Sequence, residues 1–248
     1  MKSDNKDCLT LDTIRDIKIY QQKNGYRFSM DAVLLYSFVN MPLIETIADL
    51  GAGSGIVGML LAKKYTNAKI LLFELQVGLT ALAEKNVRLN NLQDRVKVIN
   101  SDLREIKTLY PSTSADYPFD VVVSNPPFRK DKSGLISDGE ERAIARHEIK
   151  LKLPELISAS QYLLKSKGRL YLVYHPARLA ELVRVLKEKG METKRLRFVH
   201  SNTRSEAKMV LVEAAKDGRT GLKVEHPLYV YDGSGGYTEE VKDMYSCD

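Results

Sequence analysis

Short apolar runs alternate with longer amphipathic segments along most of the chain. The runs are rich in β-branched or aromatic residues and are bounded by glycine, proline or polar clusters, so they predict strands at 46–50, 69–74, 95–99, 119–124 and 168–174. The segments between them have apolar residues at helical spacing and predict helices from a glycine turn to about 65, and at about 78–90, 140–164 and 176–189. This alternation indicates an α/β fold with a mostly parallel sheet covered by helices on both faces.

Two features modify this pattern toward the carboxyl terminus. Two further strands at 194–199 and 207–213 follow one another without a helix between them, which predicts one antiparallel strand in a sheet of seven. Pro154 lies inside the predicted helix 140–164 and indicates a kink or a break there. One more strand candidate, 227–231, lies in the tail.

The first forty residues show a different pattern. Residues 1–13 lack periodicity and are expected to be loose, whereas residues 16–21 alternate apolar and polar side chains and the alternation resumes at 26–28. Because Asn24-Gly25 separates the two alternating runs, the sequence predicts a β-hairpin that turns there. Ser29 is the expected N-cap of an apolar helix from about 30 to 39, which Pro42 ends.

Composition and charge exclude several classes of protein. The chain has 248 residues, of which 44% are hydrophobic, with no apolar run near the ~20 residues of a membrane helix and no signal-like amino terminus. Its two cysteines, Cys8 and Cys247, form no metal-binding pattern with the four histidines, so we expect a cytoplasmic protein without metal or membrane attachment.

The net charge of +6 is unevenly spread. Residues 176–219 carry eleven Lys and Arg against six Asp and Glu, whereas residues 220–248 carry two against six. A basic block of this kind favours a polyanionic partner such as RNA, because neutralising phosphates provides most sequence-independent affinity. A solvated basic surface without a partner is the alternative.

A glycine-rich turn follows the first predicted core strand. Gly51-Ala-Gly-Ser-Gly-Ile-Val-Gly58 joins this strand to a helix, and such a turn brings the backbone close to a ligand. Acids lie at or beside three strand ends, where open α/β sheets bind ligands: Asp49, Glu74 and Asp102. Glu74 follows Gly55 by nineteen residues, a spacing typical of a carboxylate that binds a ribose.

The same residues also fit a nicotinamide site, because Gly53-Ser-Gly-Ile-Val-Gly matches the dinucleotide fingerprint. A nicotinamide-dependent oxidoreductase is therefore the main rival interpretation of the glycine turn. Two features favour a methyltransferase: Asp49 precedes the glycines with the spacing Asp-x-Gly-x-Gly-x-Gly, and a proline-rich turn ends the strand 119–124.

That proline-rich turn is Asn125-Pro126-Pro127-Phe128. Each proline fixes its own φ near −65° and holds the preceding residue in an extended conformation, so the turn is stiff. The Asn125 side-chain oxygen and the Pro126 carbonyl can each accept one N–H, and Phe128 can stack on a planar ring. The turn therefore suits a flat group that carries an NH2.

The glycine and proline turns together resemble those of class I methyltransferases that use S-adenosylmethionine (SAM), whose Asn-Pro-Pro-aromatic motif holds the nitrogen to be methylated. The resemblance implies a Rossmann-like, seven-stranded fold and SAM as cofactor. It implies that Gly51, Gly53 and Gly55 receive the amino-acid end of SAM, with Asp49 beneath them, and that Asn125 adjoins the cofactor. Glu74 and Leu75 would bind the ribose, and Ser101, Asp102 and Leu103 would bind the adenine.

Flanking motifs narrow the resemblance. Residues 28–35, Ala145-Arg-His-Glu and Gly236-Tyr-Thr-Glu-Glu look like those of the bacterial tRNA1(Val) adenine-N6 methyltransferase family, and the likeness covers nearly the whole chain. It implies methylation of adenine N6 beside the anticodon of a tRNA, with Asn125, Pro126, Pro127 and Phe128 as catalytic residues. Arg129, Arg146 and His147 would lie near the substrate mouth. A charged helix face is the alternative for Arg146 and His147.

Three alternatives stay open on this evidence: a guanine-N2 methyltransferase of rRNA or tRNA, a protein glutamine N5 methyltransferase, and an RNA-binding protein without turnover. For the domain organisation we expect a hairpin-and-helix attachment at 1–42, a SAM-dependent methyltransferase core at 43–219, and an acidic tail at 220–248 that packs on the core.

Overall fold

A computed structural model describes residues 9–23, 30–113, 118–126 and 152–246. Within these residues nine strands form one sheet: β3 (Thr46–Leu50), β4 (Lys69–Glu74), β5 (Val96–Asn100), β6 (Phe119–Ser124), β7 (Leu164–Tyr174), β8 (Met191–His200), β9 (Ala207–Lys216), β10 (Lys223–Val224) and β11 (Leu228–Tyr229). The helices are α1 (Met30–Phe38), α2 (Ile56–Lys64), α3 (Val77–Leu89), α4 (Ile106–Leu109), α6 (Leu153–Leu163), α7 (Leu179–Glu188) and α8 (Glu239–Tyr245), with short 3-10 helices η2 (Leu103–Glu105) and η3 (Pro176–Arg178).

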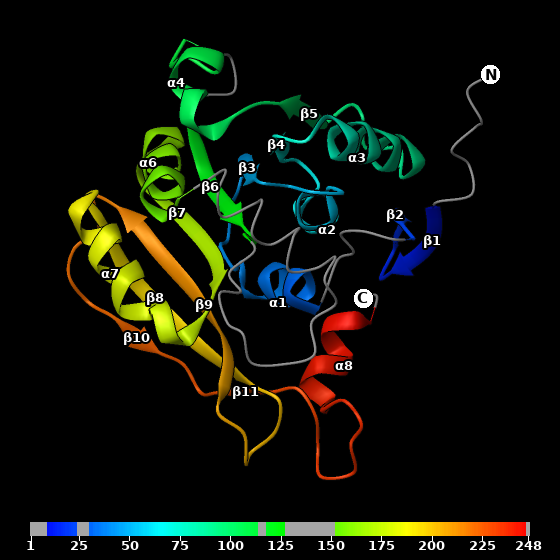
Figure 1. Cartoon of the computed structure of the whole chain (residues 1–248), viewed down its shortest axis with the longest axis vertical. Coiled ribbons are helices and arrows are strands. Elements are labelled where there is room, and N and C mark those ends of the chain that lie inside the picture. Colours follow the sequence, from blue (N-terminus) through cyan, green and yellow to red (C-terminus); the bar gives the residue numbers. More distant parts are fainter. Residues whose placement is uncertain (1–8, 24–29, 114–117, 127–151, 247–248) are drawn as a thin grey trace.

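The strand order across the sheet is β10-β8-β9-β7-β6-β3-β4-β5, and β11 pairs with β8 as well (Figure 1). Neighbouring strands from β7 to β5 are parallel, whereas β9 is antiparallel to both β7 and β8. The predicted mostly parallel sheet with one antiparallel strand is confirmed, and the short strands β10 and β11 extend the expected seven. The carboxyl ends of β3, β4, β5, β6, β7 and β8 therefore meet at one edge of the sheet.

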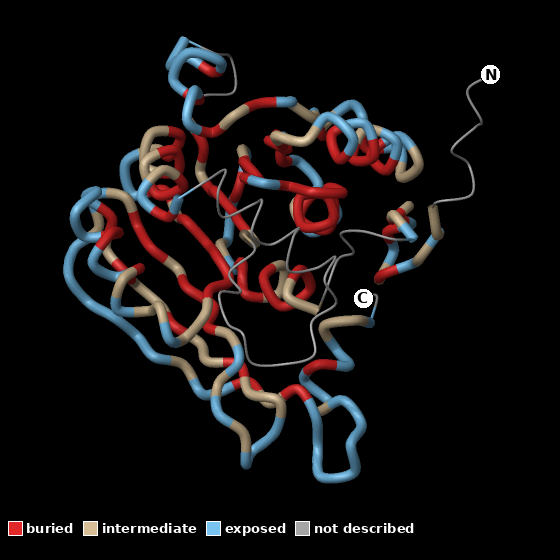
Figure 2. The backbone as a smooth tube through the Cα atoms, in the orientation of Figure 1, coloured by how far each residue is buried: buried red, intermediate tan, exposed pale blue. Residues whose placement is uncertain are grey.

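Both faces of the sheet are covered, which explains why apolar side chains of its central strands point to both faces. On one face, side chains such as Val121 and Val123 of β6 join a buried cluster with α1, α2 and α3. On the other face, Val122 joins a second cluster with α4, α6 and α7. Figure 2 shows the buried residues running through the central strands and the inward sides of these helices.

The amino-terminal region differs from the prediction. Residues 9–13 are not loose, because β1 (Leu9–Ile14) pairs in antiparallel register with β2 (Ile17–Gln22). The chain turns at Arg15 and Asp16, with Arg15 at a positive φ of 49°. Burial of Ile14, Ile17 and Ile19 in the cluster under α1 and α2 stabilises this hairpin without a turn glycine. The predicted turn at Asn24-Gly25 and the predicted N-cap Ser29 lie outside the described residues.

The carboxyl-terminal half agrees with the prediction at one place and departs from it at another. Helix α6 starts at Leu153 with Pro154 in its first turn, where a proline needs no N–H partner, so Pro154 marks a break, one of the two outcomes expected there. Residues 140–151 of the predicted helix lie outside the described residues. Helix α8 was not predicted from the sequence. It packs against α1, and Val241 is fully buried in the same cluster as α1 and α2.

Candidate active site

Strands β3 and β6 are neighbours, and this pairing brings the glycine turn and the proline turn together. Asp49 lies opposite Val123 in the parallel register, so the last residues of the two strands, Leu50 and Ser124, end side by side. The buried Ser124 hydroxyl donates to the Leu50 carbonyl at 2.8 Å and fixes this junction. Gly51 begins one turn directly after Leu50, and Asn125 begins the other directly after Ser124.

The glycine turn has a conformation that needs its glycines. Gly51, Gly53 and Gly55 have φ values of 72°, 59° and 87°, in the left-handed region that other residues rarely adopt. The amides of Gly51 and Ala52 both donate to the Phe73 carbonyl of β4, at 2.9 and 3.0 Å. The turn is thus attached to the neighbouring strand and delivers the chain into α2.

Asp49 supports the turn from inside the protein. Its side chain is 2% exposed, and Oδ2 accepts the Gly58 amide of α2 at 3.0 Å. Burial raises the pKa of Asp49 to about 7; the Gly58 hydrogen bond acts in the opposite direction, and the nearby Glu74 carboxylate adds to the rise. A positively charged ligand at this place would favour the ionised carboxylate.

Glu74 connects the end of β4 to the glycine turn. Glu74 is 3% exposed. Its Oε2 accepts a hydrogen bond from the Gly53 amide at 2.9 Å, and its Oε1 accepts one from the Gln76 amide at 2.8 Å. A carboxylate oxygen has more than one acceptor site, so both oxygens keep capacity for a ligand hydroxyl. Glu74 therefore orders the turn and stands where a ribose-binding carboxylate is expected.

The third predicted acid lies after β5. Asp102 caps η2 by accepting the Arg104 amide at 2.9 Å, and it also pairs with the Arg104 guanidinium. The side-chain hydrogen bond from Arg104 is the main reason that the pKa of Asp102 lies below its ordinary value. Ser101 donates its amide to the Glu74 carbonyl at 3.0 Å, and Leu103 is buried behind it, so this segment is fixed against the end of β4, beside Leu75.

Two buried hydroxyls test whether this edge fits a polar cofactor. Ser54, within the glycine turn, and Ser101 are 2% and 5% exposed, and within the described part of the chain neither hydroxyl oxygen has a hydrogen-bond partner. Buried polar atoms are normally paired, so orphaned hydroxyls indicate a missing partner. Together with the acids at three strand ends, they fit a ligand that carries hydroxyls, an amine and a positive charge, as SAM does.

Asparagines of α3 form a connection that the sequence analysis missed. Asn86 is fully buried: its Oδ1 accepts the Tyr20 amide at 2.8 Å, and its Nδ2 donates to the carbonyls of Tyr20 at 3.1 Å and Ser54 at 3.0 Å. One turn later, Asn90 exchanges the same pair of bonds with Lys18. The two amides thus pair with the free edge of β2, and Asn86 alone also holds the glycine turn. The i, i+4 spacing of the two asparagines is the sequence signal that could have indicated a shared face.

The remaining predicted site residues divide by position. Asn125 and Pro126 are half-buried where the chain leaves β6, and Asn125 has no hydrogen bond within the residues that the structure describes. Five predicted residues lie outside that part of the chain: Pro127, Phe128, Arg129, Arg146 and His147. Among the described residues, no group of three His, Cys, Asp or Glu side chains could hold a metal ion.

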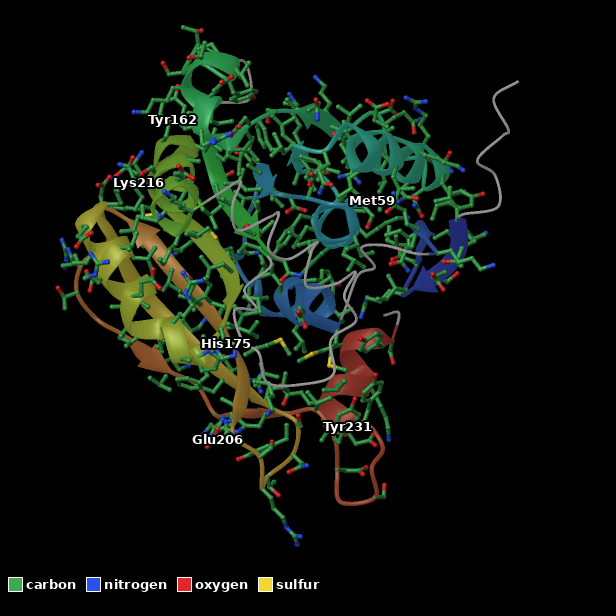
Figure 3. All side chains as sticks on the ribbon, in the orientation of Figure 1. Met59, Tyr162, His175, Glu206, Lys216 and Tyr231 are labelled. Carbon is green, nitrogen blue, oxygen red and sulfur yellow. The ribbon has the colours of Figure 1, made fainter. Side chains whose placement is uncertain are left out.

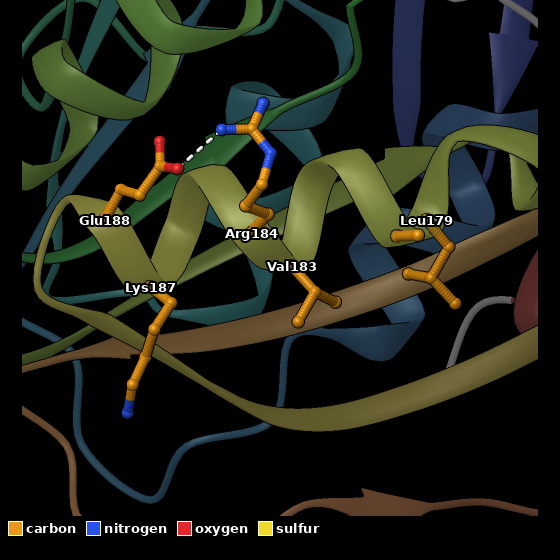
Figure 4. A pocket seen from close by; sticks show the side chains of 6 residues that line it. Leu179, Val183, Arg184, Lys187 and Glu188 are labelled. Atoms are coloured by element: carbon orange, nitrogen blue, oxygen red, sulfur yellow. Dashed lines mark hydrogen bonds and ion pairs between the residues drawn. The ribbon is translucent and has the colours of Figure 1, made fainter.

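A surface hollow elsewhere on the described structure contains none of these residues. It follows the outward side of α7 between Leu179 and Glu188, where Val183 is exposed and Arg184 pairs with Glu188 at 2.5 Å (Figure 4). Because α7 covers the second face of the sheet, this hollow is separate from the edge with the two turns. The described helices include none that is long and apolar enough to span a membrane.

Comparison with known proteins identifies a family and several relatives. The model of the family "Methyltransferase small domain" matches residues 28–198. A tRNA1(Val) (adenine(37)-N6)-methyltransferase of Porphyromonas gingivalis is 30% identical over 191 residues, 75% of this chain and 73% of the relative. The enzyme of the same name from Dyadobacter fermentans is 23% identical over 222 residues, covering 89% of each chain.

Solved structures share the fold. The crystal structure described as a predicted O-methyltransferase from Agrobacterium tumefaciens is 25% identical, with a TM-score of 0.67, over 87% of this chain and 95% of that one. The structure of TYW2 from Pyrococcus horikoshii in complex with MeSAdo has a TM-score of 0.57 and 19% identity, over 86% of this chain and 73% of that one. The second likeness concerns the fold alone.

Proposed function

The chain belongs to the methyltransferase small domain family, and from that premise we propose that it transfers a methyl group from SAM to adenine N6 of a tRNA, at the base beside the anticodon. Relatives named for this reaction match most of the chain. The observation that carries the proposal is the Ser124–Leu50 junction, which sets Asn125 directly beside the glycine turn. A nitrogen held at one turn is then close to a group bound at the other.

The roles in this proposal are assigned as follows, and the junction of the two turns supports those of Asn125 and Pro126. Bound SAM supplies an electrophilic methyl group on a sulfonium. The Asn125 side-chain oxygen and the Pro126 carbonyl accept the two N–H bonds of the adenine amino group, which directs the nitrogen lone pair away from the ring plane. Proximity and alignment account for most of the acceleration. Pro127 keeps the turn extended, and Phe128 stacks on the base.

On the cofactor side, the backbone of Gly51, Gly53 and Gly55 approaches the amino-acid end, supported by Asp49 and Glu74. The free acceptor sites of Glu74, with Leu75 beside them, take the ribose hydroxyls. The segment that ends β5 takes the adenine: Ser101, Asp102 and Leu103. A charge-assisted hydrogen bond contributes about 1.5–3 kcal/mol, so loss of Glu74 weakens SAM binding strongly.

The partner in this proposal is tRNA, attracted by the basic block 176–219 and gripped by the core surface itself. Arg129, Arg146 and His147 are assigned to the mouth of the substrate site. The division into an attachment at 1–42, a core at 43–219 and a tail at 220–248 belongs to the same proposal, and a tRNA substrate would place the enzyme in the cytoplasm.

The test is transfer of tritiated methyl groups from SAM to bulk bacterial tRNA, to DNA and to protein, followed by digestion and identification of the labelled product. We expect label in N6-methyladenosine of tRNA. Label in methylated guanosine or in glutamine would contradict the adenine assignment, and absence of any labelled acceptor would contradict turnover. Calorimetry with SAM and with NADH checks the cofactor, since saturable binding of NADH alone would overturn it.

A further inference from the structure

The short strand β11 places part of the tail at the same edge of the sheet as the proposed site. Strands β8 and β7 are both antiparallel to β9, so they run parallel to each other. Because β6 is parallel to β7, β8 also runs parallel to β6. β11 is parallel to β8, with Tyr229 opposite His200, the last residue of β8. The Tyr231 amide then donates to the Ser201 carbonyl at 2.8 Å. At a strand spacing of about 4.8 Å, β11 lies about 19 Å from β6 across the sheet.

Three tyrosines of this tail stack on one another. A small hairpin pairs Tyr231 with Tyr237, and their rings stack with centroids 5.4 Å apart and planes 20° apart. The ring of Tyr245, in α8, stacks on Tyr237 at 5.9 Å and 6°. Tyr245 packs against the buried cluster of α1 and α2, so the stack is anchored in the core at one end. We call these residues, Tyr231, Tyr237 and Tyr245, the tyrosine stack.

The other end of the tyrosine stack is exposed to solvent. Tyr231 is the terminal ring and is 40% exposed, and Tyr237 is 38% exposed. A core contact would bury these rings, whereas an exposed, rigid aromatic face is suited to receive another flat ring. The ring at the anchored end is uncharged near neutral pH, since burial and its tyrosine neighbours raise the pKa of Tyr245 to about 12.

Two acidic side chains near the stack are paired with cations of the chain: Glu239 with Lys242 and Glu240 with Arg197, both at 2.6 Å. Asp232 accepts three hydrogen bonds from Ser234 and Gly236, which hold it in the turn and lower its pKa, so this carboxylate stays ionised. The two ion pairs reduce the repulsion that the tail exerts on a phosphate chain, and the charge of Asp232 remains.

A cation lies in the adjoining loop. The loop between β8 and β9 starts at Ser201, the residue bonded to Tyr231, and contains the exposed Arg204. The Arg204 amide donates to the Asn202 side chain at 2.9 Å, which orders the loop. Figure 3 shows Glu206 of this loop and Tyr231 at the same end of the molecule. An aromatic face with a neighbouring arginine is the combination that single-stranded nucleic acid binds.

We propose that the tyrosine stack is a docking platform for an unpaired base of the RNA substrate, which stacks on the exposed face of Tyr231 while Arg204 contacts the adjoining phosphate. The proposal deepens the proposed function, because RNA is the partner in both. The platform contacts a nucleotide other than the methylated one, since about 19 Å of sheet edge separates β11 from β6. It therefore contributes to RNA affinity and not to SAM binding.

The first test uses the absence of tryptophan from this chain. Tyr231→Trp introduces a single fluorophore into the full-length protein, and Leu43→Trp introduces one at an exposed position before β3, at the opposite edge of the sheet. We expect bulk bacterial tRNA to quench the fluorescence of Tyr231→Trp at the midpoint of RNA binding and to leave that of Leu43→Trp unchanged. Equal responses of the two variants, or no response at Tyr231→Trp, would overturn the proposal.

The second test measures affinity for the same tRNA by filter binding. Loss of one base–aromatic stack weakens binding about tenfold, so we expect this loss for Tyr231→Ala, near-native affinity for Tyr231→Phe, and unchanged SAM affinity in both. Equal RNA affinity of Tyr231→Ala and wild type refutes the platform. Because neither test requires methyl transfer, RNA binding that depends on Tyr231 without a labelled acceptor would refute the proposed function and leave the platform standing.

Discussion

Removal of the Asn86 side chain should separate the role of α3 in the fold from its role at the glycine turn. Asn86→Ala removes a fully buried side chain and three hydrogen bonds, two part-buried ones to the backbone of Tyr20 and a buried one to the Ser54 carbonyl. Asn90→Ala is the matched control one turn away: it deletes two exposed bonds to Lys18 and one bond to the Asn86 carbonyl, which keeps its backbone partner, and it leaves the glycine turn untouched. The two substitutions are chemically identical.

The expected magnitudes differ because burial differs. A buried backbone group left unpaired costs about 1–3 kcal/mol, so loss of the three bonds of Asn86 should lower the free energy of unfolding by about 3 kcal/mol. Water replaces the exposed bonds of Asn90, and about 1 kcal/mol is expected there. Loss of the Ser54 anchor, about 1 kcal/mol, should weaken SAM binding about fivefold in Asn86→Ala only.

Equilibrium urea unfolding gives the free energy of each variant, and isothermal calorimetry gives the dissociation constant for SAM. Native SAM affinity in Asn86→Ala would show that the Ser54 contact does not position the turn. Equal losses of stability in the two variants would contradict the argument from burial.

Three further predictions concern the acid, the glycines and the ion pairs. Because the pKa of Asp49 is raised to about 7 in the fold, the folded protein retains a proton that the unfolded chain releases, and stability from this group is lost as pH rises toward 7. Urea unfolding between about pH 5 and pH 8 should show a decrease about 3 kcal/mol larger in wild type than in Asp49→Asn, and parallel pH profiles would contradict it. Gly58→Ala sets a Cβ 2.2 Å from Leu72 Cδ2 and should lower the free energy of unfolding by about 1–3 kcal/mol. The Cβ of Gly78→Ala meets nothing within 4 Å, so this variant should be as stable as wild type or more stable. A larger loss of stability in Gly78→Ala than in Gly58→Ala would refute the packing argument. Arg195→Ala, which removes half-buried pairs with Glu213 and Glu225, should lower the unfolding free energy by about 3 kcal/mol against about 0.5 for Arg184→Ala on the surface, and equal losses would contradict this.

The sequence predicted best the strands that are buried on both faces. The predicted bounds 46–50, 69–74 and 119–124 agree with β3, β4 and β6. A short, largely apolar run between turn residues is too short for a typical helix and is therefore best explained as a buried strand. The turn at Arg15 and Asp16 contains no glycine, asparagine or proline, so local chemistry gave no sign of the hairpin. Its stability comes from isoleucines that pack on distant helices.

The sequence could predict those features of the candidate site that depend only on the order and direction of the strands. Acids at the ends of β3, β4 and β5 had to gather at one edge once the strands were parallel. Their hydrogen bonds could not be predicted, since the contact of Glu74 with the Gly53 amide depends on the path of the turn. The contact between Asn86 and Ser54 joins residues 32 positions apart, and no local pattern encodes it.

The central claim is that the turn at Asn125 holds the acceptor nitrogen beside a SAM site that does not depend on it. The most direct measurement compares Asn125→Ala with wild type for two quantities, the turnover rate with tRNA and the dissociation constant for SAM. We predict that turnover falls about a hundredfold or more while SAM affinity stays within a few-fold. An unchanged turnover rate would contradict the assignment of Asn125, and a parallel loss of SAM affinity would contradict the separation of the two turns.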